Sequence, residues 1–423
     1  MEETSIKLAV YIPTLAGGGA ERVMLRLAGE LAGRGYRVDL LLKRRRGAYE
    51  GQLPSGVRII ELERGWKAWG RCFLAIKARS ADCVGLALPV LLAPKPMMSL
   101  RYLPAFVGYL RRERPAALVS ALYYANLLAL WARELAGVPT QTVVCEHNTI
   151  SQTLASEIKW PAPRRRRLLG LIHYTYSLAE GIVAVSNGVA DDLAAMTGIA
   201  RASITTIYNP AVSADLDELA GAPLDHPWLA PAQPPVVLGV GRLEAQKDFM
   251  TLIRAFAQLR AAQPARMIIL GEGKQRPLLE REIRRLGLDE DVQLPGWVDN
   301  PYAYMARAAV YVLSSAYEGL PGALIEALAC GCPVVSADCP SGPAEILDRG
   351  RYGTLVPVGD DTALAQAIMT TLAAPPKRAT LQARAQQFGA KAAVERYLEV
   401  LLGTPEPSRA RDAVNGVRPC RLG

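Results

Sequence analysis

Short apolar runs alternate with longer stretches of helical period along most of the chain. The runs are rich in Val, Leu and Ile, which is typical of parallel strands buried on both faces. They predict strands at 7–12, 36–42, 117–121, 140–145, 181–186, 236–240, 266–270, 292–294, 310–313, 333–337 and 353–356. Helical stretches lie between them, for example at 277–286 and 343–347. This alternation predicts an α/β fold.

The strand pattern is interrupted once, near the middle of the chain. Residues 211–233 are rich in proline and acidic residues, which indicates a linker. Since 423 residues suffice for two or three domains, we expect a first domain over 1–210 and a second over 234–380. The amphipathic stretch from Lys377 to Leu402 predicts a closing helix or helices, with 381–402 as the C-terminal helix. The composition of 403–423 predicts a disordered tail.

Two glutamates eight positions apart follow the predicted strand at 310–313. Glu318 falls in the strand-to-helix turn, and Glu326 falls on the first or second turn of the next helix. At the start of that helix, the amides of Gly322, Ala323 and Leu324 are expected to point into a crevice. Free N–H groups and the helix dipole favour an anion there. The alternative is a surface helix with two scattered acids.

Two cations follow an earlier strand. The run Pro235–Gly241 ends in glycine, Arg242 comes next, and Lys247 lies five residues further on. Arginine offers a planar fork to phosphate oxygens and lysine offers a point charge, so the pair can clamp a diphosphate. Two solvated basic residues are the competing interpretation.

Together these motifs resemble the retaining, nucleotide-sugar-dependent glycosyltransferases of family 4. Glu318 and Glu326 match the paired-glutamate signature of that family, and Arg242 and Lys247 match its diphosphate clamp. Further matches, in the family's order, are Gly17–Val23, Tyr208–Pro210 and Tyr352–Pro357. The resemblance covers the chain up to about residue 400. It implies the GT-B fold, two Rossmann-like, doubly wound domains facing across a cleft, with the 381–402 helix packing back toward the first domain.

The resemblance also implies roles for individual residues. A UDP-linked sugar is expected in the second domain, with its ribose on Glu326, its transferred sugar on Glu318 and its diphosphate on the cations and helix amides. Closure would bring Gly18 and Gly19 over the phosphates. Gly322 stands where the family commonly has asparagine, so a side-chain contact to the donor is absent. The insertion at about 65–110 is expected to carry acceptor-specific structure.

His147 follows the strand at 140–145, at a strand end where ligands bind in open α/β sheets. By its resemblance to the family histidine it is expected beside the donor sugar or the leaving phosphate. An ordinary loop histidine is the alternative. His147 and Glu318 are the predicted catalytic residues.

The cysteines do not indicate a metal site. Cys330, Cys332 and Cys339 have neither a nearby histidine nor a fourth cysteine, so the spacing does not fit zinc. We expect no structural metal, no cofactor and no disulfide framework, and a reaction that is independent of metal.

Positive charge is concentrated in the first half. Residues 1–210 carry 27 Lys and Arg and 16 Asp and Glu, for a net charge of +11, whereas residues 211–423 have a net charge of −2. Basic clusters at 43–46, 111–114 and 164–167, together with an aromatic and apolar stretch at 65–109, favour an anionic membrane surface as partner. A solvated basic face is the alternative. Nucleic acid is not expected, because no nucleic-acid module is recognisable.

We therefore predict a retaining hexosyltransferase that acts on a glycan or lipid-linked acceptor in the assembly of cell-surface polysaccharide or glycolipid. The start of the chain has no secretory pattern, and no apolar run reaches the length of a spanning helix. We thus expect a cytoplasmic protein, peripheral at the inner face of the cell membrane. The rival functions are a sugar-nucleotide epimerase, a dinucleotide oxidoreductase and a non-catalytic membrane-associated assembly protein. The contiguous Gly17–Gly19 lack the spacing of the dinucleotide fingerprint.

Overall fold

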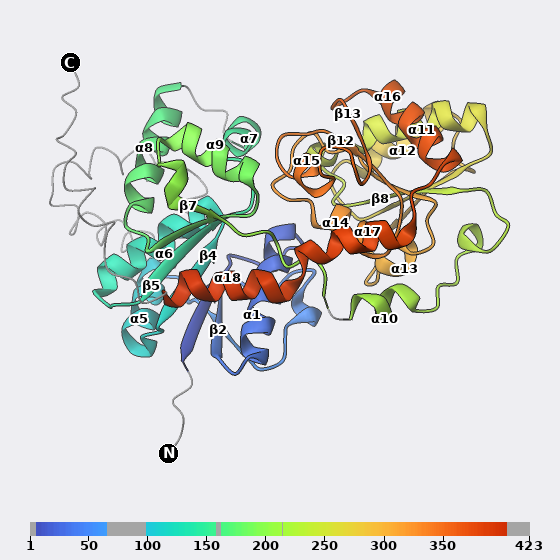
Figure 1. Cartoon of the computed structure of the whole chain (residues 1–423). Coiled ribbons are helices and arrows are strands. Elements are labelled where there is room, and N and C mark those ends of the chain that lie inside the picture. Colours follow the sequence, from blue (N-terminus) through green and yellow to red (C-terminus); the bar gives the residue numbers. More distant parts are fainter. Residues whose placement is uncertain (1–5, 66–98, 158–161, 214, 404–423) are drawn as a thin grey trace.

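The computed structural model describes residues 6–65, 99–157, 162–213 and 215–403. Two α/β domains face each other, and each is built around one sheet of parallel strands (Figure 1). In both sheets the strand order reverses beside the first strand of the domain, as in doubly wound folds. The predicted α/β architecture with two Rossmann-like domains is confirmed.

The N-terminal domain has a seven-stranded sheet in the order β3-β2-β1-β4-β5-β6-β7. The strands are β1 Lys7–Tyr11, β2 Arg37–Leu42, β3 Val57–Glu61, β4 Ala117–Ala121, β5 Gln141–Glu146, β6 Gly181–Ala184 and β7 Ile204–Thr206. The helices are α1 Gly19–Gly33, α5 Leu103–Glu113, α6 Tyr123–Ala136, α7 Ile150–Glu157, α8 Ala162–Tyr176 and α9 Asn187–Thr197.

The C-terminal domain has a six-stranded sheet in the order β10-β9-β8-β11-β12-β13. Its strands are β8 Val236–Val240, β9 Arg266–Leu270, β10 Val292–Gly296, β11 Val310–Leu313, β12 Val334–Ala337 and β13 Thr354–Val356. Its helices are α11 Phe249–Ala262, α12 Arg276–Arg285, α13 Tyr302–Met305, α14 Gly322–Ala329, α15 Pro343–Ile346 and α16 Asp361–Ala373. The connection from the N-terminal domain contains α10 Leu216–Gly221.

The predicted strands agree with the observed ones to within two residues at each end. The pattern missed β3 and β7, which are the two edge strands of the N-terminal sheet. β3 is only partly buried and β7 has three residues, two of them threonines. A continuous apolar run marks only strands with both faces covered, so these edges were not recognised.

The predicted closing stretch contains two helices, and the boundary at residue 381 falls inside the first of them. α17 (Arg378–Ala385) packs on α14 of the C-terminal domain, and α18 (Ala390–Leu402) packs on α1, β4 and β5 of the N-terminal domain. Between them lie a turn of 3-10 helix and Gly389. Figure 1 shows α18, in red, lying across the N-terminal domain next to α1. The chain therefore crosses between the domains twice.

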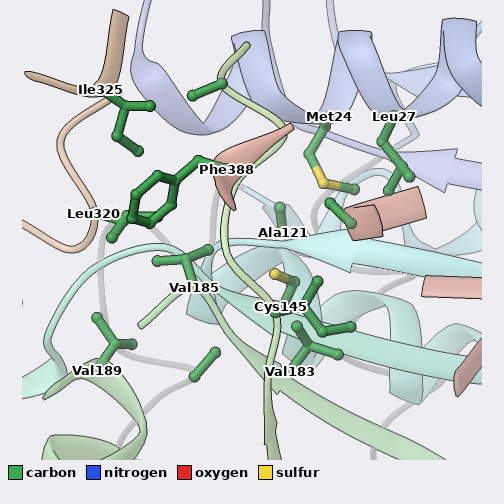
Figure 2. Packing of buried hydrophobic residues seen from close by; sticks show 14 of the residues in the cluster. Met24, Leu27, Ala121, Cys145, Val183, Val185, Val189, Leu320, Ile325 and Phe388 are labelled. Carbon is green, nitrogen blue, oxygen red and sulfur yellow. The ribbon is translucent and has the colours of Figure 1, made fainter. Parts of the chain in front are cut away.

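Hydrophobic packing continues from one domain to the other at these crossings. Figure 2 shows the ring of Phe388, on the second crossing, beside Leu320 of the C-terminal domain and Val185 of the N-terminal domain. The two crossings also pair with each other through a bridge between Val212 and Gly389. Apolar contacts thus join the domains next to the linker.

A carboxylate reinforces this junction. Glu345 of α15 accepts hydrogen bonds from the backbone amides of Asn187 and Gly188, both at 2.9 Å, and from the Tyr208 hydroxyl at 3.1 Å. The amides belong to the first turn of α9, where a negative charge is favourable. The N-terminus of a helix in one domain is therefore capped by an acid of the other.

Some expectations fall on residues that the structure does not describe. Most of the 65–110 insertion (66–98) and the tail from residue 404 lie outside the described residues. Among the helices that are described, none is both long enough and apolar enough to cross a membrane.

Candidate active site

A cavity of about 420 Å³ lies between the domains, lined by the loops that follow the central strands of both sheets. This is the edge of a parallel sheet where ligands bind, and the volume is in the range of small-molecule sites. Nine of the ten predicted site residues line it: Gly18, Gly19, His147, Arg242, Lys247, Glu318, Gly322, Ala323 and Glu326. Motifs that are far apart in the sequence are therefore brought together.

The two predicted clamp cations enter the cavity from the loop after β8. The Arg242 side chain is exposed and forms no salt bridge with any carboxylate of the described residues. Lys247 is paired, since its Nζ lies 2.5 Å from Oε1 of Glu318. The Ser315 hydroxyl donates to the same oxygen at 2.7 Å. Glu318 is thereby held in one orientation at the cavity wall.

Helix α14 presents its first turn to the cavity. Pro321 is its N-cap, and Gly322 and Ala323 are its first two residues and line the cavity. Leu324 stands apart from the other predicted donor-binding residues. Its amide donates to the Pro321 carbonyl at 3.1 Å, and the residue is completely buried and does not line the cavity. Of the three predicted amides, those of Gly322 and Ala323 thus belong to residues that line the cavity.

Glu326 is buried at the far end of the cavity and is already paired. Its Oε2 lies 3.3 Å from Nη1 of Arg22, and its Oε1 lies 3.3 Å from Nη2 of Arg26. The Tyr302 hydroxyl donates to Oε1 at 3.2 Å. Both arginines belong to α1 of the opposite domain, so the carboxylate expected to meet a ribose also connects the two domains.

His147 reaches the cavity from the end of β5. Burial lowers the pKa of its imidazole from 6.5 to about 4, so the ring is neutral near pH 7. Its Nε2 is buried and has no hydrogen-bond partner. Its carbonyl oxygen lies so close to Gly319 that a methyl group there would overlap it. The imidazole can thus offer an uncharged hydrogen bond to a ligand, while the backbone touches the Glu318 loop.

A buried polar network lies beneath His147. Glu146 accepts hydrogen bonds from the Tyr176 hydroxyl and from Nδ2 of Asn126, the latter at 3.1 Å. Asn126 also accepts from the Ser120 hydroxyl at 2.6 Å. Burial raises the pKa of Glu146 from 4.5 to about 7. The network connects β4, α6, β5 and α8 and fixes the strand end that carries His147.

Gly18 and Gly19 lie at the start of α1, as N-cap and first residue. The carboxylate of Glu21 folds over Gly18, and the Thr14 hydroxyl donates to that carboxylate at 3.3 Å. An anionic ligand at these amides requires the Glu21 side chain to turn away. The Glu21 side chain therefore lies over the amides of the predicted phosphate position.

Several residues at the cavity were not among the predicted site residues. Arg22 and Arg26 line the cavity and share Glu326 with Tyr302, which does not line it, and Asn148 and Asn209 each place a buried carbonyl oxygen without a partner near the cavity. A signal existed for the arginines, because they lie four residues apart on one helix directly after the glycine loop and so share a face. Nothing in the sequence connects them to Glu326.

Comparisons with known proteins show the family and the fold of the chain. Residues 18–210 match the model described as "Glycosyl transferase 4-like domain", and residues 234–374 match "Glycosyl transferases group 1". One relative, from Campylobacter jejuni, is N-acetylgalactosamine-N,N'-diacetylbacillosaminyl-diphospho-undecaprenol 4-alpha-N-acetylgalactosaminyltransferase. It is 30% identical over 367 residues, which cover 86% of this chain and 90% of the relative. A lipopolysaccharide core biosynthesis glycosyltransferase of Rhizobium meliloti, LpsE, is 34% identical over 41% of this chain and 52% of its own.

Solved structures share the fold. HepE of Anabaena, crystallised with UDP and glucose, has a TM-score of 0.70 at 21% identity, covering 94% of this chain and all of HepE. A glycosyltransferase of Rickettsia africae has a TM-score of 0.71 at 16% identity, covering 95% of this chain and all of the other. These similarities confirm the GT-B arrangement. The chain belongs to the group 1 glycosyltransferases.

Proposed function

We propose that the protein transfers a hexose from a UDP-linked donor, with retention and without a metal ion, to a hydroxyl of a lipid-linked glycan. The observation that carries this proposal is the composition of the interdomain cavity. Two cations, two helix amides, two carboxylates and a neutral imidazole meet there on loops of both domains. A nucleotide sugar presents the complementary groups: an anionic diphosphate, a ribose diol and a sugar with several hydroxyls.

The diphosphate is assigned to the Arg242 side. Arg242 has no carboxylate partner among the described residues, and the Gly322 and Ala323 amides face the same cavity. As the sugar leaves, negative charge grows on the β-phosphate. Fixed cations and dipoles stabilise such charge most strongly when they are in place before the reaction. In this proposal Arg242, Lys247 and the amides carry that stabilisation.

The transferred sugar is assigned to Glu318 and His147. One oxygen of Glu318 is engaged by Lys247 and Ser315, which leaves the other for sugar hydroxyls. His147 is neutral, so it can hydrogen-bond the sugar without adding a charge. Retention is supported by the name of the Campylobacter relative, which describes an alpha linkage. The common UDP-hexoses are alpha-linked, so an alpha product corresponds to retention.

The acceptor is assigned to the basic N-terminal domain. Arg164, Arg165, Arg166 and Arg167 are exposed in the first turns of α8, where the helix dipole disfavours cations. None of them forms a salt bridge with a carboxylate in the described parts of the chain. An anionic partner would offset this charge. The lipid diphosphate in the name of the Campylobacter relative and the inner face of the cell membrane both fit.

The proposal is tested by incubating the protein with UDP-, GDP- and ADP-hexoses and a sugar carried on polyprenyl diphosphate. We expect release of UDP and a lengthened acceptor with one donor class, with equal rates in the presence and absence of EDTA. NMR of the product gives the anomeric configuration. Transfer from GDP- or ADP-hexose would overturn the UDP assignment. An inverted anomeric configuration would overturn retention, and loss of activity with EDTA would overturn metal independence. Free epimerised sugar nucleotide without acceptor would indicate an epimerase.

A further inference from the structure

The carboxylate assigned to the ribose is shared between the domains. Glu326 accepts from Arg22 on Oε2 and from Arg26 and Tyr302 on Oε1, at 3.2–3.3 Å. Tyr302 belongs to the same domain as Glu326. The two arginines reach it from α1 across the cleft, one helical turn apart.

The two arginines are anchored differently. Arg26 also donates to the carbonyl oxygens of Pro210 and Ala211 in the linker and to the Tyr302 hydroxyl. Among the described residues, the Arg22 guanidinium donates only to Glu326 and to the Tyr302 hydroxyl, the latter at 3.0 Å, and it lies 5.6 Å from the centre of the Tyr302 ring. Arg22 is also the more exposed of the two, at 29% against 19%. Arg22 can therefore leave Glu326 with the loss of fewer hydrogen bonds than Arg26.

A count of hydrogen bonds shows why one of them must leave. A carboxylate has about four lone-pair positions, and three of those of Glu326 are used. A ribose diol brings two donors. Both hydroxyls can bind only if one present donor gives up its place. Arg26 is fixed to the linker and Tyr302 to the same domain, which leaves Arg22.

We propose that Arg22 and the donor's ribose exchange places on Glu326. This inference rests on the proposed function, in which Glu326 binds the ribose. Without nucleotide, Arg22 holds Glu326 across the cleft. When nucleotide binds, a ribose hydroxyl takes Oε2 and the guanidinium is released into the cavity, which it also lines. Arg22 is then a positioning residue that sets donor affinity and connects donor binding to the contact between the domains.

Uridine is the suitable probe, because it carries the ribose and no phosphate. Removal of a cation therefore does not weaken attraction to a diphosphate. In Arg22→Gln, uridine should bind roughly three- to tenfold more tightly than in the wild type, which is the range expected when a partly exposed ion pair no longer competes. NMR titration measures such weak binding. The analogue 2′,3′-dideoxyuridine lacks the diol and should show no gain.

Two further variants sharpen the test. Arg26→Gln is the matched control on the same helix, and we expect no gain in uridine affinity from it. In Arg22→Gln/Glu326→Gln the gain should vanish, because the shared carboxylate is gone. Unchanged or weaker uridine binding in Arg22→Gln, or an equal gain for dideoxyuridine, would overturn the exchange.

The outcome is separable from that of the proposed function. A diol-dependent gain without sugar transfer to any acceptor would support the exchange and refute the transferase assignment. Sugar transfer from a UDP donor without the gain in uridine affinity would support the transferase assignment and refute the exchange. Melting temperatures of the variants show whether each is folded.

Discussion

Nζ of Lys247 lies 2.5 Å from Oε1 of Glu318, and the two side chains are only 19% and 9% exposed. The pair joins the loop after β8 to the loop after β11. Each partner offsets the cost of burying the other's charge, so the loss of either leaves an uncompensated ion. Arg242 lies on the same loop as Lys247. Its side chain is exposed, so its charge does not need a buried partner.

Arg242→Ala and Lys247→Ala should therefore differ in stability but not in their effect on catalysis. Each should lower kcat by on the order of 10²-fold or more, because each removes a charge that stabilises the leaving diphosphate. Only Lys247→Ala should also lower the free energy of unfolding, by roughly 1–3 kcal/mol. Arg281→Ala, an exposed arginine of α12, is the control for both. Wild-type kcat in either clamp variant would exclude the assigned diphosphate position.

Substitutions of Glu326 and Glu318 should have different effects on the steady-state constants. Glu326→Gln should raise KM for the donor with a smaller effect on kcat, since ribose contacts are alike in the ground and transition states. Glu318→Gln should lower kcat more than it changes donor affinity, because Glu318 is assigned to the reacting sugar. Calorimetry with UDP checks the first expectation independently. Full UDP affinity in Glu326→Gln contradicts the ribose assignment.

Gly319→Ala tests the contact between the domains. Its new methyl group would overlap the His147 carbonyl oxygen and so hold the cleft open. We expect kcat to fall at least tenfold, roughly the effect of displacing a catalytic group by a fraction of an ångström. UDP binding to the C-terminal domain should change little. Gly108→Ala, where the added carbon meets nothing within 4 Å, is the matched control. Equal kcat for the two variants would show that the contact is unimportant for turnover.

The buried Glu146 should make stability depend on pH. Its pKa is raised by burial from 4.5 to about 7, so its full contribution to stability is present below pH 4.5 and is lost as pH rises through 7. Glu146→Gln does not titrate. Between pH 5 and pH 8, the free energy of unfolding of the variant, measured with urea, should rise relative to that of the wild type by up to about 3 kcal/mol. The contribution of His147 to stability has the opposite pH dependence, because it is lost as pH falls through about 4. The wild type and the variant share this contribution, so it cancels in the comparison. A constant difference across this range would mean that Glu146 is ionised in the fold.

The arginine cluster of α8 should determine binding to anionic membranes. Each basic residue near such a surface contributes about 1 kcal/mol, and salt screens the attraction. Sedimentation with anionic vesicles at low salt should therefore fall when Arg164, Arg165, Arg166 and Arg167 are replaced by Gln, with UDP affinity unchanged. Replacement of four exposed arginines of the C-terminal domain is the control: Arg281, Arg284, Arg349 and Arg351. Equal sedimentation of both variants, or none by the wild type, would exclude this surface.

The sequence predicted the parts of the site that are local in the chain. One strand is followed at short spacing by Arg242 and Lys247, and another by Glu318 and the start of α14. Apolar runs mark where such strands end. The pairing of Glu326 with Arg22 and Arg26 joins residues about 300 positions apart, so it depends on how the domains meet. Local spacing also did not reveal that the Leu324 amide donates to the Pro321 carbonyl within the turn. One basic residue was misjudged as well, because Lys43 is half-buried, donates to Ser99 and has its pKa lowered by burial to about 7.

Helix α18 is the last helix described in the chain, yet it covers the first sheet, where the Tyr397 hydroxyl lies 3.2 Å from Sγ of Cys145. A fragment that ends at residue 210 would leave this face of the N-terminal sheet open to water. The two halves therefore cannot be produced as independent proteins by cutting the gene at the linker. Residues 390–402 would have to be supplied separately or moved by circular permutation ahead of residue 6. Ribosomal synthesis must likewise reach Leu402 before the first domain to emerge is complete.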